Sequence, residues 1–212
     1  MANQHTLAQL SQWGSANVSD ALRALGKSFQ TMPAGISPLA PDMSVAGPAF
    51  TVRCYPGATW AMEQALEQAN DGDVLIVDGG ASPDAILMGA LMSTRAKARG
   101  IAGAVLDAAV RDVNDIIQLG FPVFARHICS RAGTFAEIGE LQTTICCGRI
   151  PVIPGDWIVA DRNGIVVVPQ AMLDNVAQET EAIHAKEAAL AKRLASGESF
   201  EEAGKSINLP SF

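Results

Sequence analysis

Residues 72–78 read GDVLIVD, and residues 102–107 read AGAVLD. Each stretch is a short apolar run that ends in an aspartate, and a run of this kind is typical of a strand buried on both faces. The segment between them, about Ile86–Ala98, has the length and composition of a helix, and Gly100 closes it. Strands that alternate with helices in this way predict an α/β fold.

The rest of the chain continues this alternation outward from the two strands. We expect helices over about residues 6–25, 59–70 and 112–119, with Ser19-Asp20 restarting the first as an N-cap, and strands over 46–55 and 121–125. Residues 138–168 are β-rich with a hairpin turn at 161–164, and a long helix is expected over about 171–196. Residues 197–212 are expected to pack against a neighbouring subunit or to fray. Because no linker or repeat interrupts the chain, the sequence predicts one compact domain over residues 1–212.

The composition argues against several classes of protein. Of the 212 residues, 49% are hydrophobic and 17% are charged, which supports a buried core. The net charge of -7 and the scattered basic residues argue against nucleic-acid binding, which needs a basic stripe. No apolar run approaches the ~20 residues that span a bilayer, and the first residues lack the pattern of a signal peptide. We therefore expect a cytoplasmic protein that binds neither nucleic acid nor membrane.

The four cysteines, Cys54, Cys129, Cys146 and Cys147, show neither the CxxC spacing of a zinc site nor a secreted disulfide framework. Adjacent residues of a strand point to opposite faces, so Cys146 and Cys147 are not expected to share a metal. All four are expected to be reduced thiols in structural roles.

Two strand-to-helix crossings could carry chemistry, because ligands of open α/β sheets collect there. The first runs from residues 78–80 to residues 89–92, where early helix amides could point at an anion. The second runs from Asp107 to Arg111 and Asp112. The Arg111 guanidinium suits a carboxylate, and Asp112 offers a hard oxygen ligand for Mg²⁺ or Mn²⁺. A cation beside an arginine could bind a 2-oxo acid and stabilise an enolate.

A structural role is the alternative for the same residues. Neighbouring Arg and Asp often form ordinary ion pairs, and Asp78 and Asp107 could serve only in turns or helix caps. Met88 and Met92 are spaced as one face of the predicted helix, which favours core packing. No HExxH or GxSxG pattern occurs, so metalloprotease and Ser-His-Asp hydrolase chemistry are not expected.

Several segments in order resemble the RraA-like family, which includes the class II 4-hydroxy-4-methyl-2-oxoglutarate/4-carboxy-4-hydroxy-2-oxoadipate aldolases. The segments are residues 17–22 (NVSDAL), 47–52 (GPAFTV), 72–78 (GDVLIVD), 96–103 (AKARGIAG), 110–112 (VRD), 154–156 (PGD) and 160–167 (ADRNGIVV). The match runs from about Asn17 to Pro169, which is far more specific than any single motif.

The resemblance implies a compact α/β fold with layered sheets of the swivelling β/β/α type, assembled as a homotrimer or hexamer with active sites between subunits. It implies a lyase that uses Mg²⁺ or Mn²⁺, cleaves a small 2-oxo acid to release pyruvate, and decarboxylates oxaloacetate. By position, Arg111 would steady the substrate oxyanion or carboxylate, and Asp112 would hold the metal. Gly89 and the backbone amides around Leu91 and Met92 would take the pyruvate carboxylate.

The chain departs from the aldolase pattern at three positions. Ala90 replaces an acidic residue that orders metal-bound waters, Ala108 replaces a glycine, and Ala58 replaces an aspartate. The loss of an outer carboxylate typically lowers metal affinity or activity about 10–100-fold. These departures leave room for a second function, a non-catalytic regulator that binds a protein partner such as a ribonuclease. Retention of Arg111-Asp112 favours the lyase.

Methyl transfer from S-adenosylmethionine is not expected. Doubly wound methyltransferases bind that cofactor at a glycine-rich turn directly after their first strand. Here Gly79-Gly80 lies mid-chain without a GxGxG pattern.

Overall fold

The computed structural model describes residues 4–206, and the centre of the fold is a parallel β-sheet. The neighbouring parallel strands are β2 (Val45–Arg53), β3 (Val74–Asp78), β5 (Gly103–Val110) and β6 (Val123–Ile128). The side chains of β3 from Val74 to Val77 are fully buried, which confirms a strand covered on both faces. Because these strands are parallel, their carboxyl ends lie at one edge of the sheet.

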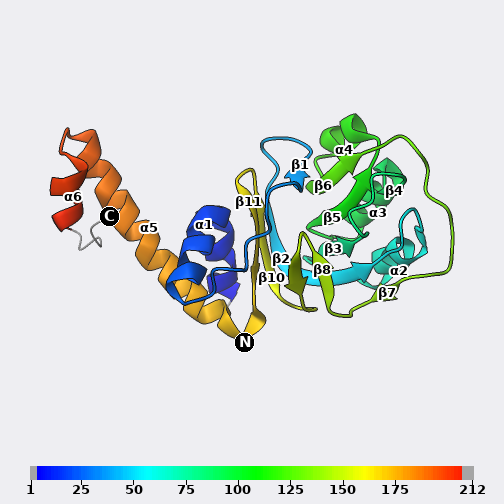
Figure 1. Ribbon diagram of the computed structural model, residues 1–212, viewed down its shortest axis with the longest axis horizontal. Helices are drawn as coiled ribbons and strands as arrows, with labels where there is room; N and C mark the ends of the chain where they lie inside the picture. The colour runs from blue at the N-terminus through cyan, green and yellow to red at the C-terminus, as the bar shows by residue number, and fades with distance from the viewer. Residues whose placement is uncertain (1–3, 207–212) are drawn as a thin grey trace.

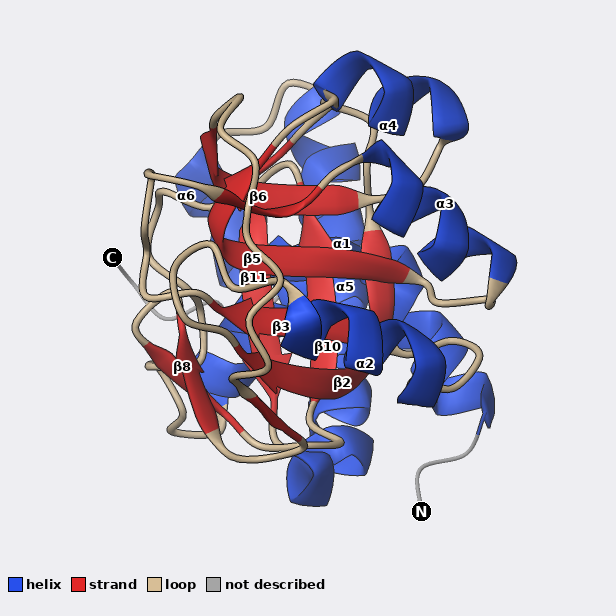
Figure 2. Ribbon diagram, turned by 90° about the vertical axis from the view of Figure 1, so that its right-hand side faces the viewer, coloured by secondary structure: helices blue, strands red, loops and turns tan. Residues whose placement is uncertain are grey.

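The helices that connect these strands cover one face of the sheet, as Figure 2 shows. They are α2 (Trp60–Gln68), α3 (Ala90–Ala98) and α4 (Val113–Leu119). A single apolar cluster joins the helices to the sheet and includes Met62, Leu75, Leu106 and Ile116. Burial of this cluster holds the helices against this face of the sheet.

Further strands extend the sheet and add a second layer on its other face. Within the described residues, the main sheet has nine strands, including β1 (Ser37–Pro38), β4 (Ile86–Met88), β7 (Glu140–Leu141) and the hairpin of β10 (Trp157–Asp161) with β11 (Gly164–Val168). The hairpin confirms the predicted turn at 161–164. A separate two-stranded sheet, β8 (Ile145–Cys147) and β9 (Ile150–Val152), packs opposite the helices, where Ile145 and Val152 share a cluster with Ile76. The layers are therefore β, β and α, as the resemblance implied.

The terminal helices pack together over the β10–β11 hairpin. They are α1 (Gln4–Ala24) and α5 (Leu173–Ala195), the latter preceded by a 3-10 turn (Gln170–Met172) and followed by α6 (Phe200–Ser206). In Figure 1, α5 projects beyond the body of the molecule and α6 lies at its far end. Helix α5 confirms the predicted helix over 171–196. Part of the predicted tail, residues 207–212, lies outside the described residues.

The sequence analysis predicted that the first helix restarts at Ser19-Asp20, but the break in α1 lies at Gly14. Gly14 has φ 77° and ψ 166°, a conformation that glycine adopts without steric cost. The carboxylate of Asp161 accepts hydrogen bonds from the backbone N–H of Ser15 at 2.8 Å and from its hydroxyl at 2.7 Å. A carboxylate from a distant strand thus caps the second half of the helix, and no local pattern could show it.

The prediction of one helix over Ile86–Ala98 was wrong at its start. Residues Ile86–Met88 form β4, which pairs parallel with β5, and the helix begins only at Ala90. Met88 is fully buried in this strand, so it does not share a helix face with Met92. The pairing also carries β5 past its predicted end at Leu106 as far as Val110. Both differences arise from tertiary strand pairing, which local periodicity does not report.

The four cysteines are free thiols. Cys146 is exposed and Cys147 is buried, which confirms that they point to opposite faces of β8. Burial raises the pKa of the Cys147 thiol and raises the pKa of Cys54 to about 12. Both thiols are therefore protonated at neutral pH, which fits a structural role.

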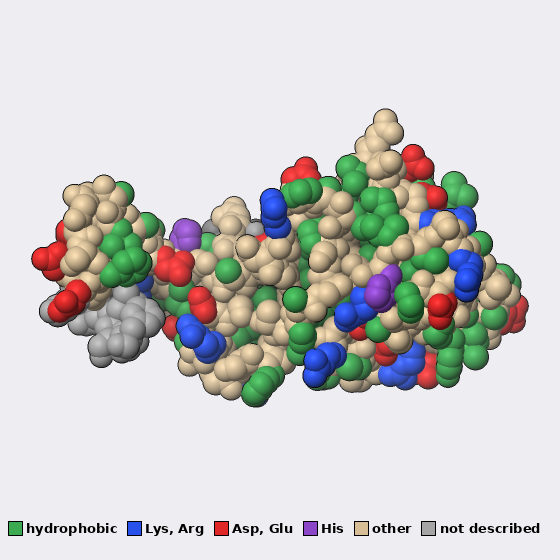
Figure 3. Space-filling view, turned by 45° about the horizontal axis from the view of Figure 1, so that its top comes forward, with side chains coloured by type: hydrophobic (Ala, Val, Ile, Leu, Met, Phe, Trp, Pro, Cys, Tyr) green, Lys and Arg blue, Asp and Glu red, His purple; other side chains and the backbone are tan. Residues whose placement is uncertain are grey.

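The surface of the described residues mixes both signs of charge. On the face drawn in Figure 3, acidic and basic side chains are interspersed with hydrophobic ones, and no continuous basic stripe crosses the residues described there. Among residues 4–206, no helix is both long and apolar enough to cross a bilayer.

Candidate functional site

The later residues of the two crossings, residues 89–92 and Arg111-Asp112, come together at the carboxyl edge of the sheet, whereas residues 78–80 and Asp107 do not line the pocket found there. Arg111 and Asp112 lie between β5 and α4, and Gly89 lies between β4 and α3. The N–H of Arg111 donates to the carbonyl of Met88 at 3.2 Å, which holds the two connections side by side. A pocket of about 230 Å³ opens here, which we call the edge pocket, and it is lined by Thr59, Ile86, Gly89, Leu91, Met92, Arg111, Asp112, Ala132 and Gly133.

The Arg111–Asp112 pair is held in place by its backbone and by the start of α3. Asp112 has φ 59°, in the left-handed region that aspartate tolerates better than most residues. This turn directs its Oδ2 to the N–H of Ala90, which donates at 3.1 Å. The Nε of Arg111 lies 3.5 Å from the same oxygen. The carboxylate is thus fixed between the helix start and the guanidinium.

Gly89 is required by space and not by backbone conformation. Its φ of -146° is extended backbone that any residue adopts. A Cβ at this position would lie 2.7 Å from Oδ2 of Asp112 and 3.3 Å from Cγ of Arg111. A side chain on residue 89 would therefore displace the carboxylate.

Several polar atoms around the edge pocket have no partner within the described part of the chain. Oδ1 of Asp112 accepts no hydrogen bond there, and the guanidinium of Arg111 donates none, although its Nε is buried. The N–H groups of Leu91 and Met92, in the first turn of α3, also lack an acceptor among residues 4–206. Free helix amides beside a cation form an anion-binding arrangement. The site therefore presents donors for a carboxylate and one oxygen for a metal ion.

A divalent cation fits this site, but with few protein ligands. Within residues 4–206, no group of three or more His, Cys, Asp or Glu side chains could enclose a metal. Mg²⁺ keeps several waters and often takes one or two carboxylates together with oxygens of its substrate. Oδ1 of Asp112 is suited to that role because its other oxygen is already fixed. Ala90 adds no second carboxylate.

The sequence analysis did not identify three residues of the edge pocket that lie in other loops between strands and helices. Thr59 precedes α2, and Ala132 and Gly133 follow β6. The loop after β6 was overlooked because that strand was expected to end at Ala125, whereas it continues to Ile128. The rule that loops after parallel strands gather at one edge was the signal that could have pointed to it.

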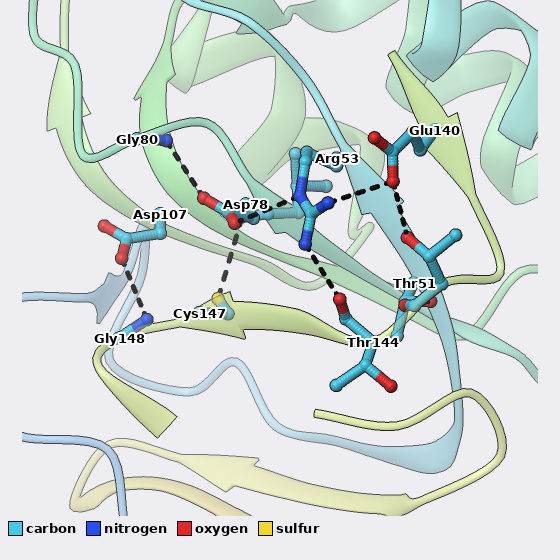
Figure 4. A network of polar contacts seen from close by, with 11 residues as sticks. Thr51, Arg53, Asp78, Gly80, Asp107, Glu140, Thr144, Cys147 and Gly148 are labelled. Carbon is cyan, nitrogen blue, oxygen red and sulfur yellow. Dashed lines mark hydrogen bonds and ion pairs between the residues drawn. The ribbon is translucent and has the colours of Figure 1, made fainter. Parts of the chain in front are cut away.

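A second set of charged residues crosses the same sheet on the face opposite the helices (Figure 4). Arg53, Asp78 and Asp107 occupy paired positions on β2, β3 and β5, and Arg126 of β6 binds Asp107. We call these four residues the charge row. The Nε of Arg53 lies 3.8 Å from Oδ2 of Asp78, and its terminal nitrogens bind Glu140 at 2.9 Å and the carbonyl of Thr144 at 2.8 Å.

At Asp107 the charge row is buried, and both carboxylate oxygens have hydrogen-bond partners. Asp107 accepts a hydrogen bond from Nε of Arg126 at Oδ1 and one from the N–H of Gly148 at Oδ2, the latter 2.8 Å long. The bond to Asp107 raises the pKa of Arg126. Oδ1 of Asp78 accepts a hydrogen bond from the N–H of Gly80 at 3.2 Å, which confirms the predicted role of Asp78 in a turn. For Asp107 that expectation was wrong, because β5 continues through it and its side chain binds the β8–β9 turn.

Comparisons with known proteins agree with this architecture. The family model described as RraA-like (Aldolase/RraA) matches residues 15–167. A protein of Halalkalibacterium halodurans named "Putative 4-hydroxy-4-methyl-2-oxoglutarate aldolase" is 36% identical over 162 residues, covering 76% of this chain and 75% of that protein. An uncharacterized protein of Pseudomonas syringae has a similar structure, with a TM-score of 0.88, 29% identity, and 97% and 95% of the two chains covered.

A third relative carries a different kind of name. The structure of the RNA-processing inhibitor RraA from Thermus thermophilis superposes with a TM-score of 0.66 at 26% identity, covering 72% of this chain and 92% of that one. The relatives thus include proteins named for an aldolase and for an inhibitor. The family model covers well over half of the sequence, and the chain belongs to the RraA-like family.

Proposed function

We propose that this chain is a divalent-metal-dependent lyase that cleaves a small 2-oxo acid, by retro-aldol cleavage or decarboxylation, and releases pyruvate. The observation that carries the proposal is the open arrangement at the edge pocket. Asp112 is fixed through Oδ2 and free at Oδ1, beside a guanidinium that makes no hydrogen bond within the described residues. The aldolase name of a 36% identical relative points to the same chemistry, with 4-hydroxy-4-methyl-2-oxoglutarate as the type of substrate.

Each group of the edge pocket has a role in this proposal. The N–H groups of Leu91 and Met92 bind the substrate carboxylate at the helix N-terminus, where the helix dipole favours negative charge. Oδ1 of Asp112 holds Mg²⁺ or Mn²⁺, which when bound polarises the 2-oxo group as a Lewis acid. The terminal nitrogens of Arg111 stabilise the negative charge that grows on a substrate oxygen as the bond breaks. The Asp112 carboxylate keeps Arg111 oriented toward that oxygen.

The reaction balances without an added reactant. In the retro-aldol direction the C4 hydroxyl gives its proton to water and becomes a carbonyl, while the C3–C4 bond breaks. The electron pair passes to C3, and the resulting enolate takes up a proton to form pyruvate. In decarboxylation of oxaloacetate, carbon dioxide leaves C3 in place of the aldehyde or ketone.

The second candidate function is a non-catalytic regulator that binds a protein partner. The observation that favours it is Ala90, which leaves the edge pocket with a single carboxylate near the proposed metal. A relative named as an RNA-processing inhibitor has the same fold. A regulator of this kind would need neither the metal nor the substrate groups of the edge pocket.

We also propose that the chain assembles as a homotrimer or hexamer with the edge pocket at a subunit boundary. The proposal rests on the resemblance to the RraA-like family, and Leu91, which lines the pocket and is 86% exposed, would be covered at such a boundary. Light scattering coupled to size-exclusion chromatography measures the mass. A mass of one 22.1 kDa chain at micromolar concentration would contradict the assembly.

The lyase proposal is tested by mixing the protein with oxaloacetate and Mg²⁺ or Mn²⁺ and following pyruvate through lactate dehydrogenase and NADH. The expected result is pyruvate release above the rate with metal alone, abolished by chelation and by Asp112→Ala. Arg111→Lys should also lose most activity, since an ammonium does not reproduce the guanidinium fork. No release above the metal-only rate, together with no metal binding, would favour the regulator.

A further inference from the structure

A second pocket opens on the other side of the Arg111–Asp112 pair. It holds about 410 Å³, and the residues that line it besides the pair are Val113, Asn114, Ile128, Cys129 and Ser130. We call it the side pocket. These residues come from the start of α4 and from the end of β6 with the loop that follows.

The pair forms a wall common to the two pockets. Arg111 and Asp112 line both, whereas the amide-bearing residues Leu91 and Met92 line only the edge pocket. A 2-oxo acid whose carboxylate lies on those amides therefore places its reacting carbons beside the pair. A substituent beyond C4 that extends past the pair would enter the side pocket, which is the larger of the two volumes.

The lining of the side pocket is neutral apart from the pair itself. Val113 and Ile128 are apolar, and the side chain of Ile128 is 68% exposed although it is large. Asn114 and Ser130 are polar but uncharged, and the Cys129 thiol lies 3.7 Å from the carbonyl of Asp84. Among the described residues, no lysine, histidine or second arginine lines this pocket.

A carboxylate placed in this pocket would lose part of its hydration and would find no lysine, histidine or further arginine in the lining among residues 4–206. Arg111 is the one positive group of the lining in residues 4–206, and in the proposed reaction it is engaged with the reacting oxygen. The metal ion at Asp112 is already occupied in that reaction by the 2-oxo group of the substrate. Moving an unpaired charge out of water is costly, whereas an alkyl group gains from contact with Ile128 and Val113.

We infer that the side pocket selects 4-hydroxy-2-oxo acids whose substituent beyond C4 is uncharged and apolar, so that cleavage yields pyruvate and an aliphatic aldehyde. This inference rests on the proposed lyase function. It differs from the substrate named for the aldolase relative, whose C4 carries a carboxylate. Oxaloacetate remains a suitable general test, because its second carboxylate is attached to C3 and lies beside Arg111.

Two substrates of equal size separate the alternatives. In 4-hydroxy-5-methyl-2-oxohexanoate an isopropyl group replaces the distal carboxylate of 4-hydroxy-2-oxoglutarate, and both release pyruvate, which is quantified by chromatography. The expected result is a kcat/KM at least about tenfold higher for the isopropyl substrate, a ratio typical of selection by an apolar pocket. Equal or higher kcat/KM for the carboxylated substrate would overturn the inference and leave the lyase intact. No pyruvate from either substrate or from oxaloacetate would overturn both.

A matched pair of variants locates the selection. Ile128→Arg places a cation in the side pocket and should lower the preference for the isopropyl substrate at least about tenfold. Ile153→Arg makes the same change at a residue that is 55% exposed and lies outside both pockets, so the preference should stay as in the parent. An unchanged ratio in Ile128→Arg would show that the side pocket does not contact the substituent and would overturn the inference.

Discussion

Two sets of arginines and aspartates lie on the same sheet and differ in how completely their polar atoms are used. In the charge row, Asp107 is 9% exposed at its side chain and accepts hydrogen bonds at both carboxylate oxygens. In the pair at the edge pocket, the Asp112 side chain is 36% exposed and its Oδ1 has no partner in residues 4–206. Identical residue types thus cross-link the fold in one place and leave atoms free for a ligand in the other.

The difference follows from what covers each set. The β8–β9 turn lies over the charge row and supplies the N–H of Gly148 to Asp107. The pair instead faces the first turn of α3, whose own amides lack acceptors among the described residues. A charged residue at a strand end is therefore informative about ligand binding only once its partners have been counted.

The largest expected effect separates the two aspartates by activity. Asp112→Asn keeps the shape of the side chain but weakens metal binding, and we expect turnover of oxaloacetate to fall about 10²–10³-fold, as when one group that stabilises the transition state is removed. Asp107→Asn should change turnover only a few fold, because Asp107 does not line the edge pocket. Steady-state kinetics at saturating Mn²⁺ measure both. A comparable loss in the two variants would remove the distinction between the sets.

Stability should show the reverse order. Asp107→Asn neutralises a buried carboxylate that binds Arg126, whose side chain is 20% exposed. We expect the unfolding free energy to fall by about 2–3 kcal/mol, at or below the lower end of the range for pairs that are buried on both sides. Asp112→Asn should change that free energy by less than about 1 kcal/mol, since its pair is partly exposed. Urea unfolding followed by circular dichroism measures both values. A larger loss for Asp112→Asn would mean that the pair serves mainly to hold the fold.

The contrast can be sharpened by adding a carboxylate where the chain lacks one. In Ala90→Asp the new side chain lies in the first turn of α3, where the helix dipole tolerates negative charge. We expect Mn²⁺ affinity to rise about 10-fold, within the usual range for outer carboxylates of metal sites. Isothermal titration calorimetry measures the change, with Ala90→Asn as the uncharged control. An equal gain in the control would attribute the effect to packing and not to charge.

The smallest effect is expected at the exposed end of the charge row. The Glu140 side chain is 48% exposed and that of Arg53 is 36% exposed, so water screens their ion pair. Glu140→Gln should lower the unfolding free energy by less than about 1 kcal/mol, measured in the same urea series as Asp107→Asn. A loss as large as that of Asp107→Asn would show that the row acts as one coupled network and not as a buried pair with an exposed extension.

The parallel core could be predicted because its signals are local. The run Val74–Val77 has no polar residue, and such a pattern is typical of a strand covered on both faces. The gathering of Gly89, Arg111 and Asp112 followed from the rule that ligand sites lie at strand ends, helped by resemblance to the family. Their catalytic and metal-binding roles remain predictions.

The features that escaped prediction depend on contacts between distant segments. β4 exists because Ile86 pairs with Ala109, and the cap of Ser15 comes from Asp161. The partners of Asp107 lie on β6 and in the β8–β9 turn, so its saturation could not be seen from neighbouring residues. The side pocket was missed because the extension of β6 to Ile128 depends on its pairing with β5.

We propose that the edge pocket is open to ligands and that the charge row is not. A calorimetric titration of Mn²⁺, with and without pyruvate, tests this claim most directly. The protein, Asp107→Asn and Asp112→Asn are compared at a temperature where all three are folded. Saturable binding that pyruvate tightens, kept in Asp107→Asn and lost in Asp112→Asn, is the predicted result. Binding that survives in Asp112→Asn, or no binding in any of the three, would contradict the assignment of the ligand site to the Arg111–Asp112 pair.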